Sequence, residues 1–271
     1  MDILGLLART LIGLSSPAPA GHAAPHQVTT LTLFGQAGAT APAAAVSASA
    51  AVDNIQKFYA EIKQVSALFR QSVTYDTFGS TKTSDGSVLI QKPGKMRWDY
   101  VEKKGTKVVT KKSFISNGQY LYMVEHDNKQ VMKKNLANDL MPVAISFLYG
   151  KGDLKAEFTA SIDTSGKFGS KDEVVVKLVP KQPSAQYKSL TLVANAKDFH
   201  VTQSIIVDSS NNVNQFRFFT PDFKKPIKET WFQFDEKSVP DYHVINADAA
   251  DNKSVLGPSV VSPPPAPAKK M

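Results

Sequence analysis

Few residues of this 271-residue chain have the types and spacing needed for catalytic or metal chemistry. Two histidines, His22 and His26, fall in an alanine-rich N-terminal segment, and the other three are isolated from one another: His126, His200 and His243. The DSSNN stretch (208–212) places oxygen ligands in series but lacks the glycine and distal glutamate of a calcium loop, so it indicates a hairpin turn. Neither a nucleophile elbow nor a phosphate-binding or dinucleotide-binding glycine motif is present. We therefore expect a protein that is not an enzyme and that uses no metal and no cofactor.

Composition and charge narrow the function classes further. The absence of cysteine excludes disulfides, thiolate metal sites and a cysteine nucleophile. A formal net charge of +8 is compatible with anionic partners, but the lysine pairs are spread over many turns rather than massed in one block. This pattern is typical of a solvated rim, so we expect no nucleic-acid partner.

The chemistry that remains is apolar binding, and its main candidate is the stretch QKPGKMRWDY (91–100). A Pro-Gly corner precedes an alternating run in which Met96, Trp98 and Tyr100 share one strand face. The opposite face receives the charged residues of the same run: Lys95, Arg97 and Asp99. Because a methionine thioether adapts to irregular contents, Met96 suits a site with a variable apolar guest.

Both ends of the chain differ in composition from the middle. Residues 1–50 contain two apolar, signal-like pieces, 3–14 and 28–50, and the second ends in Ala48-Ser49-Ala50, a pattern that a signal peptidase accepts. We predict that 1–50 is a targeting segment removed on export, with a retained disordered arm as the alternative. The Pro/Ala-rich tail, 246–271, is expected to be disordered.

The elements between these ends are two helices and many strands. One amphipathic helix is predicted over 53–66 with Asp53 as its N-cap, and an apolar one over 141–149 between Pro142 and Gly150. Turn signals recur about every ten residues at Asp85-Gly86, Asn117-Gly118, Asp127-Asn128 and Asn211-Asn212. The intervening runs include 68–78, 157–163, 173–180, 189–196 and 227–234. About eleven strands in meander order predict a mainly β protein with one large antiparallel sheet, curled or closed.

Two short helices cannot cover the inner face of such a sheet. Either barrel closure fills the interior with side chains, or a cavity remains for an apolar ligand. Periodicity alone leaves both alternatives open.

The order of these motifs resembles that of the LolA family, the periplasmic carriers of outer-membrane lipoproteins. An amphipathic helix runs into a strand, here FYAEIKQVSALFRQSV, and is followed by SDGSVLIQKPGKMRWDY and by the hairpin ISNGQYLYMVEHDNKQV. The likeness continues through LYGKGDL, LVPK (178–181), IVDSSNNVNQFRF and WFQF, and it covers about residues 53–245. We therefore expect three parts: the targeting segment 1–50, a LolA-like carrier domain 51–245 and the tail 246–271.

The resemblance implies a single unclosed antiparallel β-barrel with a helical lid and an apolar cavity for acyl chains. The cavity residues that it suggests are Met96, Trp98, Tyr100, Phe69, Phe232 and Phe234. The lid residues are Phe58, Ile62, Ile145, Phe147 and Leu148. Lys92 stands where the family has a lid-contacting arginine, and a lysine lacks the planar donor fork of arginine.

The resemblance also implies the function and the partners. It suggests a monomeric periplasmic carrier of acylated lipoproteins, loaded by an inner-membrane lipoprotein-releasing ABC transporter and unloaded by an outer-membrane lipoprotein acceptor. Three alternatives remain: a carrier of another envelope lipid or glycolipid, an envelope sensor on the same fold, and a structural or interaction protein with a closed core.

Overall fold

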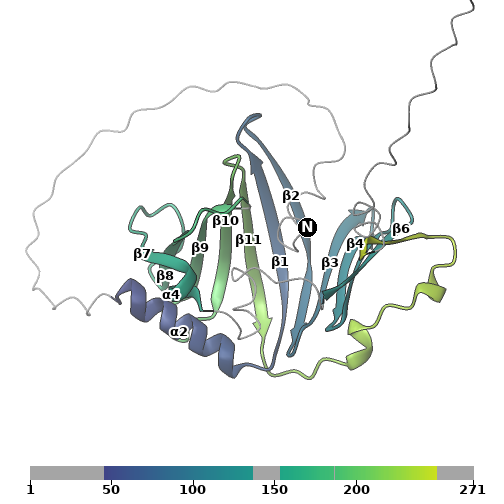
Figure 1. The fold of residues 1–271 in the computed structure, drawn as a ribbon, viewed down its shortest axis with the longest axis horizontal. Helices are drawn as coiled ribbons and strands as arrows, with labels where there is room; N and C mark the ends of the chain where they lie inside the picture. The colour runs from purple at the N-terminus through teal and green to yellow at the C-terminus, as the bar shows by residue number, and fades with distance from the viewer. Residues whose placement is uncertain (1–45, 137–152, 186, 249–271) are drawn as a thin grey trace, which may run out of the picture. The chain divides into compact units, whose positions relative to one another are not determined.

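A computed structural model of the protein describes residues 46–136, 153–185 and 187–248 (Figure 1). The elements of the N-terminal half are α2 (Ala48–Glu61), β1 (Gln64–Tyr75), β2 (Ser80–Gln91), β3 (Lys95–Lys104), β4 (Lys107–Asn117), β5 (Tyr120–Glu125) and β6 (Gln130–Asn135). Those of the C-terminal half are α4 (Leu154–Glu157), β7 (Phe158–Ile162), β8 (Glu173–Pro180), β9 (Tyr187–Asn195), β10 (Val201–Asp208), β11 (Val213–Asp222), the 3-10 helices η3 (Glu229–Phe232) and η4 (Glu236–Ser238), and β12 (His243–Asn246).

The strands form one 12-stranded sheet in the order β12-β6-β5-β4-β3-β2-β1-β11-β10-β9-β8-β7. Two consecutive meanders meet where β1 pairs with β11, and within the described residues the order ends at β12 and β7 without closing. The prediction of a mainly β, unclosed sheet with about eleven strands is therefore confirmed. The twelfth strand, β12, was not predicted. It pairs with β6 in parallel, and its last residue, Asn246, lies in the range predicted as the tail.

Most predicted turns lie between strands, and one does not. Asn117-Gly118, Asp127-Asn128 and Asn211-Asn212 connect β4–β5, β5–β6 and β10–β11. The prediction of a turn at Asp85-Gly86 is wrong, because β2 runs through both residues and the preceding turn lies at 76–79. The predicted strand 227–234 is wrong as well, since Glu229–Phe232 within this stretch forms the 3-10 helix η3.

The described residues divide into two compact units. The first comprises 46–62, 70–83 and 153–219, and in it α2 packs against α4, β7 and β8 (Figure 1). The helix contributes a fully buried stripe to a core that β8, β9 and β10 complete: Ala51, Val52, Ile55 and Tyr59 against Leu178, Leu190, Leu192 and Ile206. The loop after β7 covers the other side of the same strands, where Phe168 packs against Val175, Val193 and Ile205.

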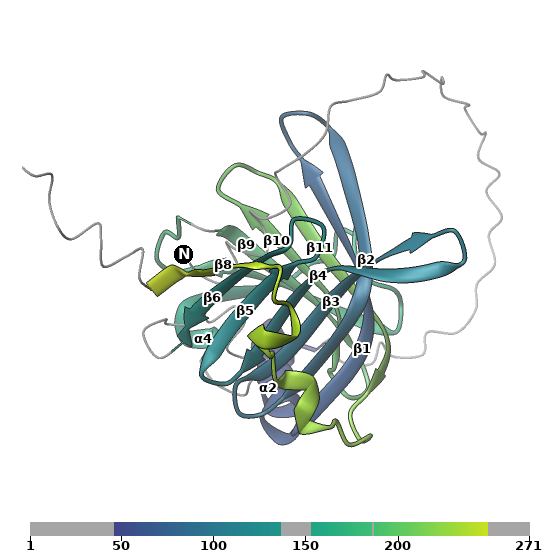
Figure 2. The same cartoon turned by 90° about the vertical axis from the view of Figure 1, so that its right-hand side faces the viewer.

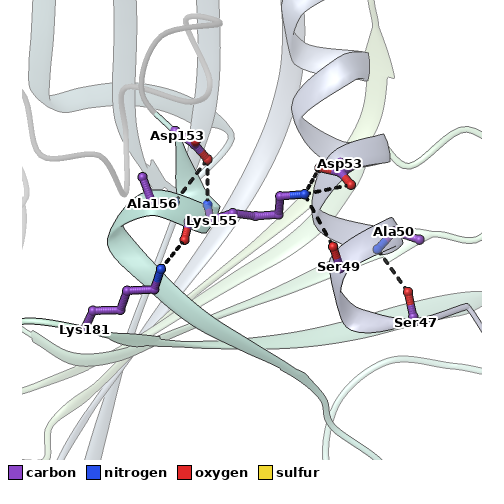
Figure 3. A network of polar contacts seen from close by, with 8 residues as sticks. All are labelled: Ser47, Ser49, Ala50, Asp53, Asp153, Lys155, Ala156 and Lys181. Carbon is purple, nitrogen blue, oxygen red and sulfur yellow. Dashed lines mark hydrogen bonds and ion pairs between the residues drawn. The ribbon is translucent and has the colours of Figure 1, made fainter.

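The helix α2 begins five residues before the predicted start. Its N-cap is Ser47, whose Oγ accepts a hydrogen bond from the Ala50 N–H at 3.2 Å, and it ends at Glu61 rather than near 66. The expected cap, Asp53, instead forms an ion pair with Lys155 of α4, with 2.7 Å between Lys155 Nζ and Asp53 Oδ1 (Figure 3). The earlier start follows from burial: Ala51 and Val52 belong to the packed stripe, so the first turn must precede them. The segment Ala48-Ser49-Ala50 lies in the first helical turn.

The short helix α4 is held beside α2 by a small polar network (Figure 3). The Asp153 carboxylate accepts hydrogen bonds from the Lys155 and Ala156 N–H groups at 2.8 and 3.2 Å, and so caps α4. The Lys181 ammonium donates to the Lys155 carbonyl at 2.7 Å, which satisfies a backbone acceptor of this single turn.

Replacing the observed cap should cost more than replacing the predicted one. We expect Ser47→Ala to lower the free energy of unfolding by about 1 kcal/mol, because an N–H group of the first turn loses its acceptor. We expect Asp53→Ala to cost less, since exposed ion pairs contribute little. Urea denaturation of both variants measures the difference, and a larger loss for Asp53→Ala would contradict the Ser47 cap.

Candidate functional site: the two faces of strand β3

Strand β3 lies between β2 and β4 with a register that fixes which side chains share a face. Trp98 is paired with Val88 of β2 and Phe114 of β4, and Met96 is paired with Ile90 and Ser116. Directly paired residues of an antiparallel ladder point to the same side. Met96, Trp98 and Tyr100 therefore lie on one face, as predicted, and their exposed fractions are only 3%, 8% and 7%.

Aromatic rings from three strands complete this face, which we call the β3 apolar face (Phe69, Met96, Trp98, Tyr100 and Phe114). The Phe69 ring of β1 lies 5.1 Å from the Trp98 ring and 5.0 Å from the Tyr100 ring, measured between centroids. Tyr100 in turn meets Phe114 edge-on at 6.0 Å. Such tilted contacts are favourable geometries for aromatic pairs. Four of the six predicted cavity residues are thus brought together.

Gly86 makes this packing possible. It is paired with Tyr100 across the β2–β3 ladder, and the Phe69 ring occupies the space beside it. A Cβ atom added at Gly86 would lie 2.2 Å from the Asp99 carbonyl oxygen and 2.5 Å from the Phe69 Cζ. From the sequence, Gly86 was interpreted as part of a turn, because Asp-Gly is a common turn signal. A glycine inside an alternating run can instead mark a position where another group packs closely against the strand backbone.

The phenol oxygen of Tyr100 belongs to the β3 apolar face. The Tyr100 hydroxyl is buried and makes no hydrogen bond in the part of the chain that the structure describes. Burial raises the pKa of this phenol well above its ordinary value, so the group is neutral at physiological pH.

The opposite face of β3 is polar and is covered by the chain's own C-terminal segment. Arg97 donates from Nε to Asp99 Oδ2 at 2.6 Å, and Asp99 Oδ1 accepts from the Ser113 hydroxyl at 2.6 Å. The Arg97 guanidinium also lies 5.5 Å from the Trp231 ring centroid and donates to the Trp231 carbonyl at 3.2 Å. An ion pair between Lys95 and Glu229 adds to the attachment of η3.

This segment, residues 227–246, continues over β4, β5 and β6, and we call it the C-terminal strap (Figure 2). The Phe234 ring packs 5.2 Å from the Tyr122 ring, and Tyr122 lies on the same face as Arg97 because both are paired with Ile115. Further along, Lys133 pairs with Glu236 at 2.9 Å, and β12 pairs with β6. The strap thus carries Phe234 on the face opposite to Met96 and Trp98, and Phe232 of the same segment is fully buried. The six predicted cavity residues therefore do not form one lining.

The predicted lid residues fall into two groups. Phe58 and Ile62 are partly buried and pack against the core of the first unit. Ile145, Phe147 and Leu148 lie outside the described residues.

Lys92 lies in the turn between β2 and β3, directly before Pro93, and its backbone N–H donates to the Lys63 carbonyl at 2.9 Å. Partial burial lowers the pKa of its ammonium. The predicted contact of Lys92 with a lid stays a prediction.

Two other kinds of feature are absent from the described ranges. No group of three histidine, aspartate or glutamate side chains there could hold a metal ion. Nor does any described helix combine the length and apolarity needed to cross a membrane. A hollow of about 490 Å³ beside the loop after β7 is lined by residues such as Ile162, Phe168 and Val174.

Comparison with known proteins decides the family. Residues 60–235 match the family described as "Outer membrane lipoprotein carrier protein LolA". The chain belongs to the LolA family. The resemblance drawn from the motifs is thereby confirmed.

Individual relatives of this LolA-family chain are distant. An outer-membrane lipoprotein carrier protein from Cupriavidus pinatubonensis is 28% identical over 147 residues, which cover 52% of this chain and 64% of that protein, just under two thirds of its length. One from Coxiella burnetii is 26% identical over 189 residues, which cover 69% and 83% of the two chains.

Similar solved structures include an uncharacterized conserved protein from Thermus thermophilus, with a TM-score of 0.46 and 9% identity over 73% of this chain and 98% of that one. A LolA superfamily protein from Nitrosomonas europaea has a TM-score of 0.37 and 10% identity over 70% and 99%.

The close approach at Gly86 gives a direct test of the packing. We expect Gly86→Ala to lower the free energy of unfolding by about 1–3 kcal/mol, because the added methyl group must displace the Phe69 ring and the β3 backbone. Ser84→Ala, two residues earlier on the same side of β2, is the matched control and should change it by no more than about 0.5 kcal/mol. Equal stability of the two variants in urea denaturation would contradict the described contact.

Proposed function

We propose that this LolA-family protein carries acylated lipoproteins through the periplasm, from the inner to the outer membrane, and that the β3 apolar face receives their acyl chains. The observation that carries the proposal is the continuous apolar surface made by Phe69, Met96, Trp98 and Tyr100 on one side of an open sheet. Family membership and the names of the relatives support the cargo class.

The energetics of acyl chains restrict how such a carrier works. Each buried methylene contributes about 0.8 kcal/mol, so complete burial of three chains would exceed the practical ceiling of roughly 20 kcal/mol for non-covalent binding. A carrier that must release its cargo therefore buries the chains only in part.

Competition for the same surface offers a way to limit the affinity. The β3 apolar face is already covered in the described state, with side chains that are at most 8% exposed. An entering acyl chain must displace what covers this face, and the displaced contacts reduce the net affinity. We propose the segments predicted as a lid, around Phe58 and Ile62 and over 141–149, as the elements that move, with Lys92 as a contact that holds them.

Two membrane complexes complete the proposed route. An inner-membrane lipoprotein-releasing ABC transporter would load the carrier, and an outer-membrane lipoprotein acceptor with higher affinity would take the cargo. Transfer of this kind follows relative affinity and needs no chemical step, so we propose a carrier that acts as a monomer and not as an enzyme.

A charge placed on the proposed binding face should abolish binding without unfolding the protein. We expect Met96→Glu to keep the circular dichroism spectrum of the native chain and to lose the binding of a fluorescent fatty-acyl probe, because a carboxylate cannot be buried against acyl chains.

Val108→Glu adds the same charge at a position that is 66% exposed near the β3–β4 turn, and it should bind the probe as the native chain does. If Met96→Glu instead unfolds the protein, Met96 belongs to an ordinary closed core. If the native chain binds no acyl probe, the proposed carrier function is wrong.

A further inference from the structure

The Tyr100 hydroxyl is not explained by the packing around it. The ring of Tyr100 contacts Phe69 and Phe114 through its edges and face, contacts that a phenylalanine ring would make equally well. The oxygen is buried and has no hydrogen-bond partner among the described residues. A buried hydroxyl without a partner destabilises a folded protein, so phenylalanine would be the more stable residue here.

A second buried tyrosine shows the ordinary arrangement. Tyr59 of α2, which is 6% exposed, accepts a hydrogen bond at its hydroxyl oxygen from the Val201 N–H at 3.1 Å. Tyr100 is as deeply buried, at 7%, but its hydroxyl lies on a face made of Met96, Trp98 and aromatic rings. The two tyrosines thus form a natural pair: the Tyr59 hydroxyl is hydrogen-bonded, and the Tyr100 hydroxyl has no hydrogen-bond partner among the described residues.

We propose that the Tyr100 hydroxyl donates a hydrogen bond to the carbonyl oxygen of a bound acyl group. This inference deepens the proposed function and rests on it. It assigns Tyr100 as the residue that recognises the polar end of an otherwise apolar guest.

The chemistry of acyl chains fits this role. A chain joined through an ester or an amide has its strong hydrogen-bond acceptor at the carbonyl, and the methylenes beyond it offer only apolar contact. A neutral phenol can donate to that oxygen without bringing a charge into the apolar face. One such bond would fix how far the chain enters, with the carbonyl at Tyr100 and the methylenes along Trp98 and Met96. It would favour esters and amides over ether-linked chains, whose oxygens are weaker acceptors.

The test removes the oxygen and keeps the ring. For Tyr100→Phe we expect the melting temperature of the unliganded protein to rise by about 2–4 °C, because an unsatisfied buried group is removed. We expect its affinity for a triacylated lipopeptide to fall about three- to tenfold, because the bound carbonyl loses its donor. Thermal unfolding and titration calorimetry measure the two effects, which have opposite signs.

Tyr59→Phe is the matched control. It removes a hydroxyl whose hydrogen bond lies within the protein, so its melting temperature should fall, in contrast to the rise expected for Tyr100→Phe. A fall in melting temperature for Tyr100→Phe as well would show that Tyr100 has a partner within the protein and would overturn the inference.

Two further lipids identify the source of the carbonyl. Short-chain diester phosphatidylcholine and its dialkyl ether counterpart differ only in their carbonyl groups. We expect the native chain to bind the diester more tightly than the diether, and Tyr100→Phe to bind the two lipids equally. If Tyr100→Phe loses affinity for the lipopeptide but still prefers the diester, the carbonyl that Tyr100 binds belongs to the lipoprotein alone.

Unchanged binding of every acylated ligand by Tyr100→Phe would overturn the inference but leave the carrier function intact. Failure of the native chain to bind any of them would instead refute the proposed function itself.

Discussion

The alternation of side chains along β3 is the constraint on which the site depends. Because Met96, Trp98 and Tyr100 must point away from Lys95, Arg97 and Asp99, one short strand serves two surfaces of opposite character. The C-terminal strap closes the polar surface with directional contacts, among them the Arg97–Trp231 hydrogen bond and the Lys95–Glu229 ion pair. The apolar surface is held by non-directional contacts between rings and a thioether. Only the apolar contacts can be replaced by contacts with a bound acyl chain without leaving charged side chains unpaired.

The same constraint explains two otherwise separate features. Gly86 is needed because the Phe69 ring must lie against the backbone of β2 to reach Trp98 and Tyr100. The Tyr100 hydroxyl, which has no hydrogen-bond partner in the described part of the chain, lies in the cluster that this approach creates. The hydroxyl costs stability in a protein that only folds, and it is reasonable in one whose apolar face meets a ligand, because residues at binding sites often depart from the most stable choice.

The sequence predicts the parts of this fold that local rules determine. Alternation located β3 and the shared face of Met96, Trp98 and Tyr100, and the asparagine-rich turns were placed correctly because their backbone demands are local. Three features depended on distant contacts and were not predicted. The start of α2 at Ala48 is set by the burial of Ala51 and Val52, and the strand position of Gly86 is set by Phe69. The third is the strap, which carries Phe234 to the opposite face. The predicted lid helix, 141–149, lies outside the described residues.

The central claim is that acyl chains lie against the β3 apolar face, and the Met96 methyl group can report on this directly. In protein labelled with ¹³C at the methionine methyl groups, six signals are expected from the sequence, and a Met96→Leu variant assigns one of them. On addition of a triacylated lipopeptide, the account predicts intermolecular nuclear Overhauser effects between acyl methylenes and the Met96 methyl group. Saturating binding without any such effect at Met96 would place the lipid elsewhere and contradict the account.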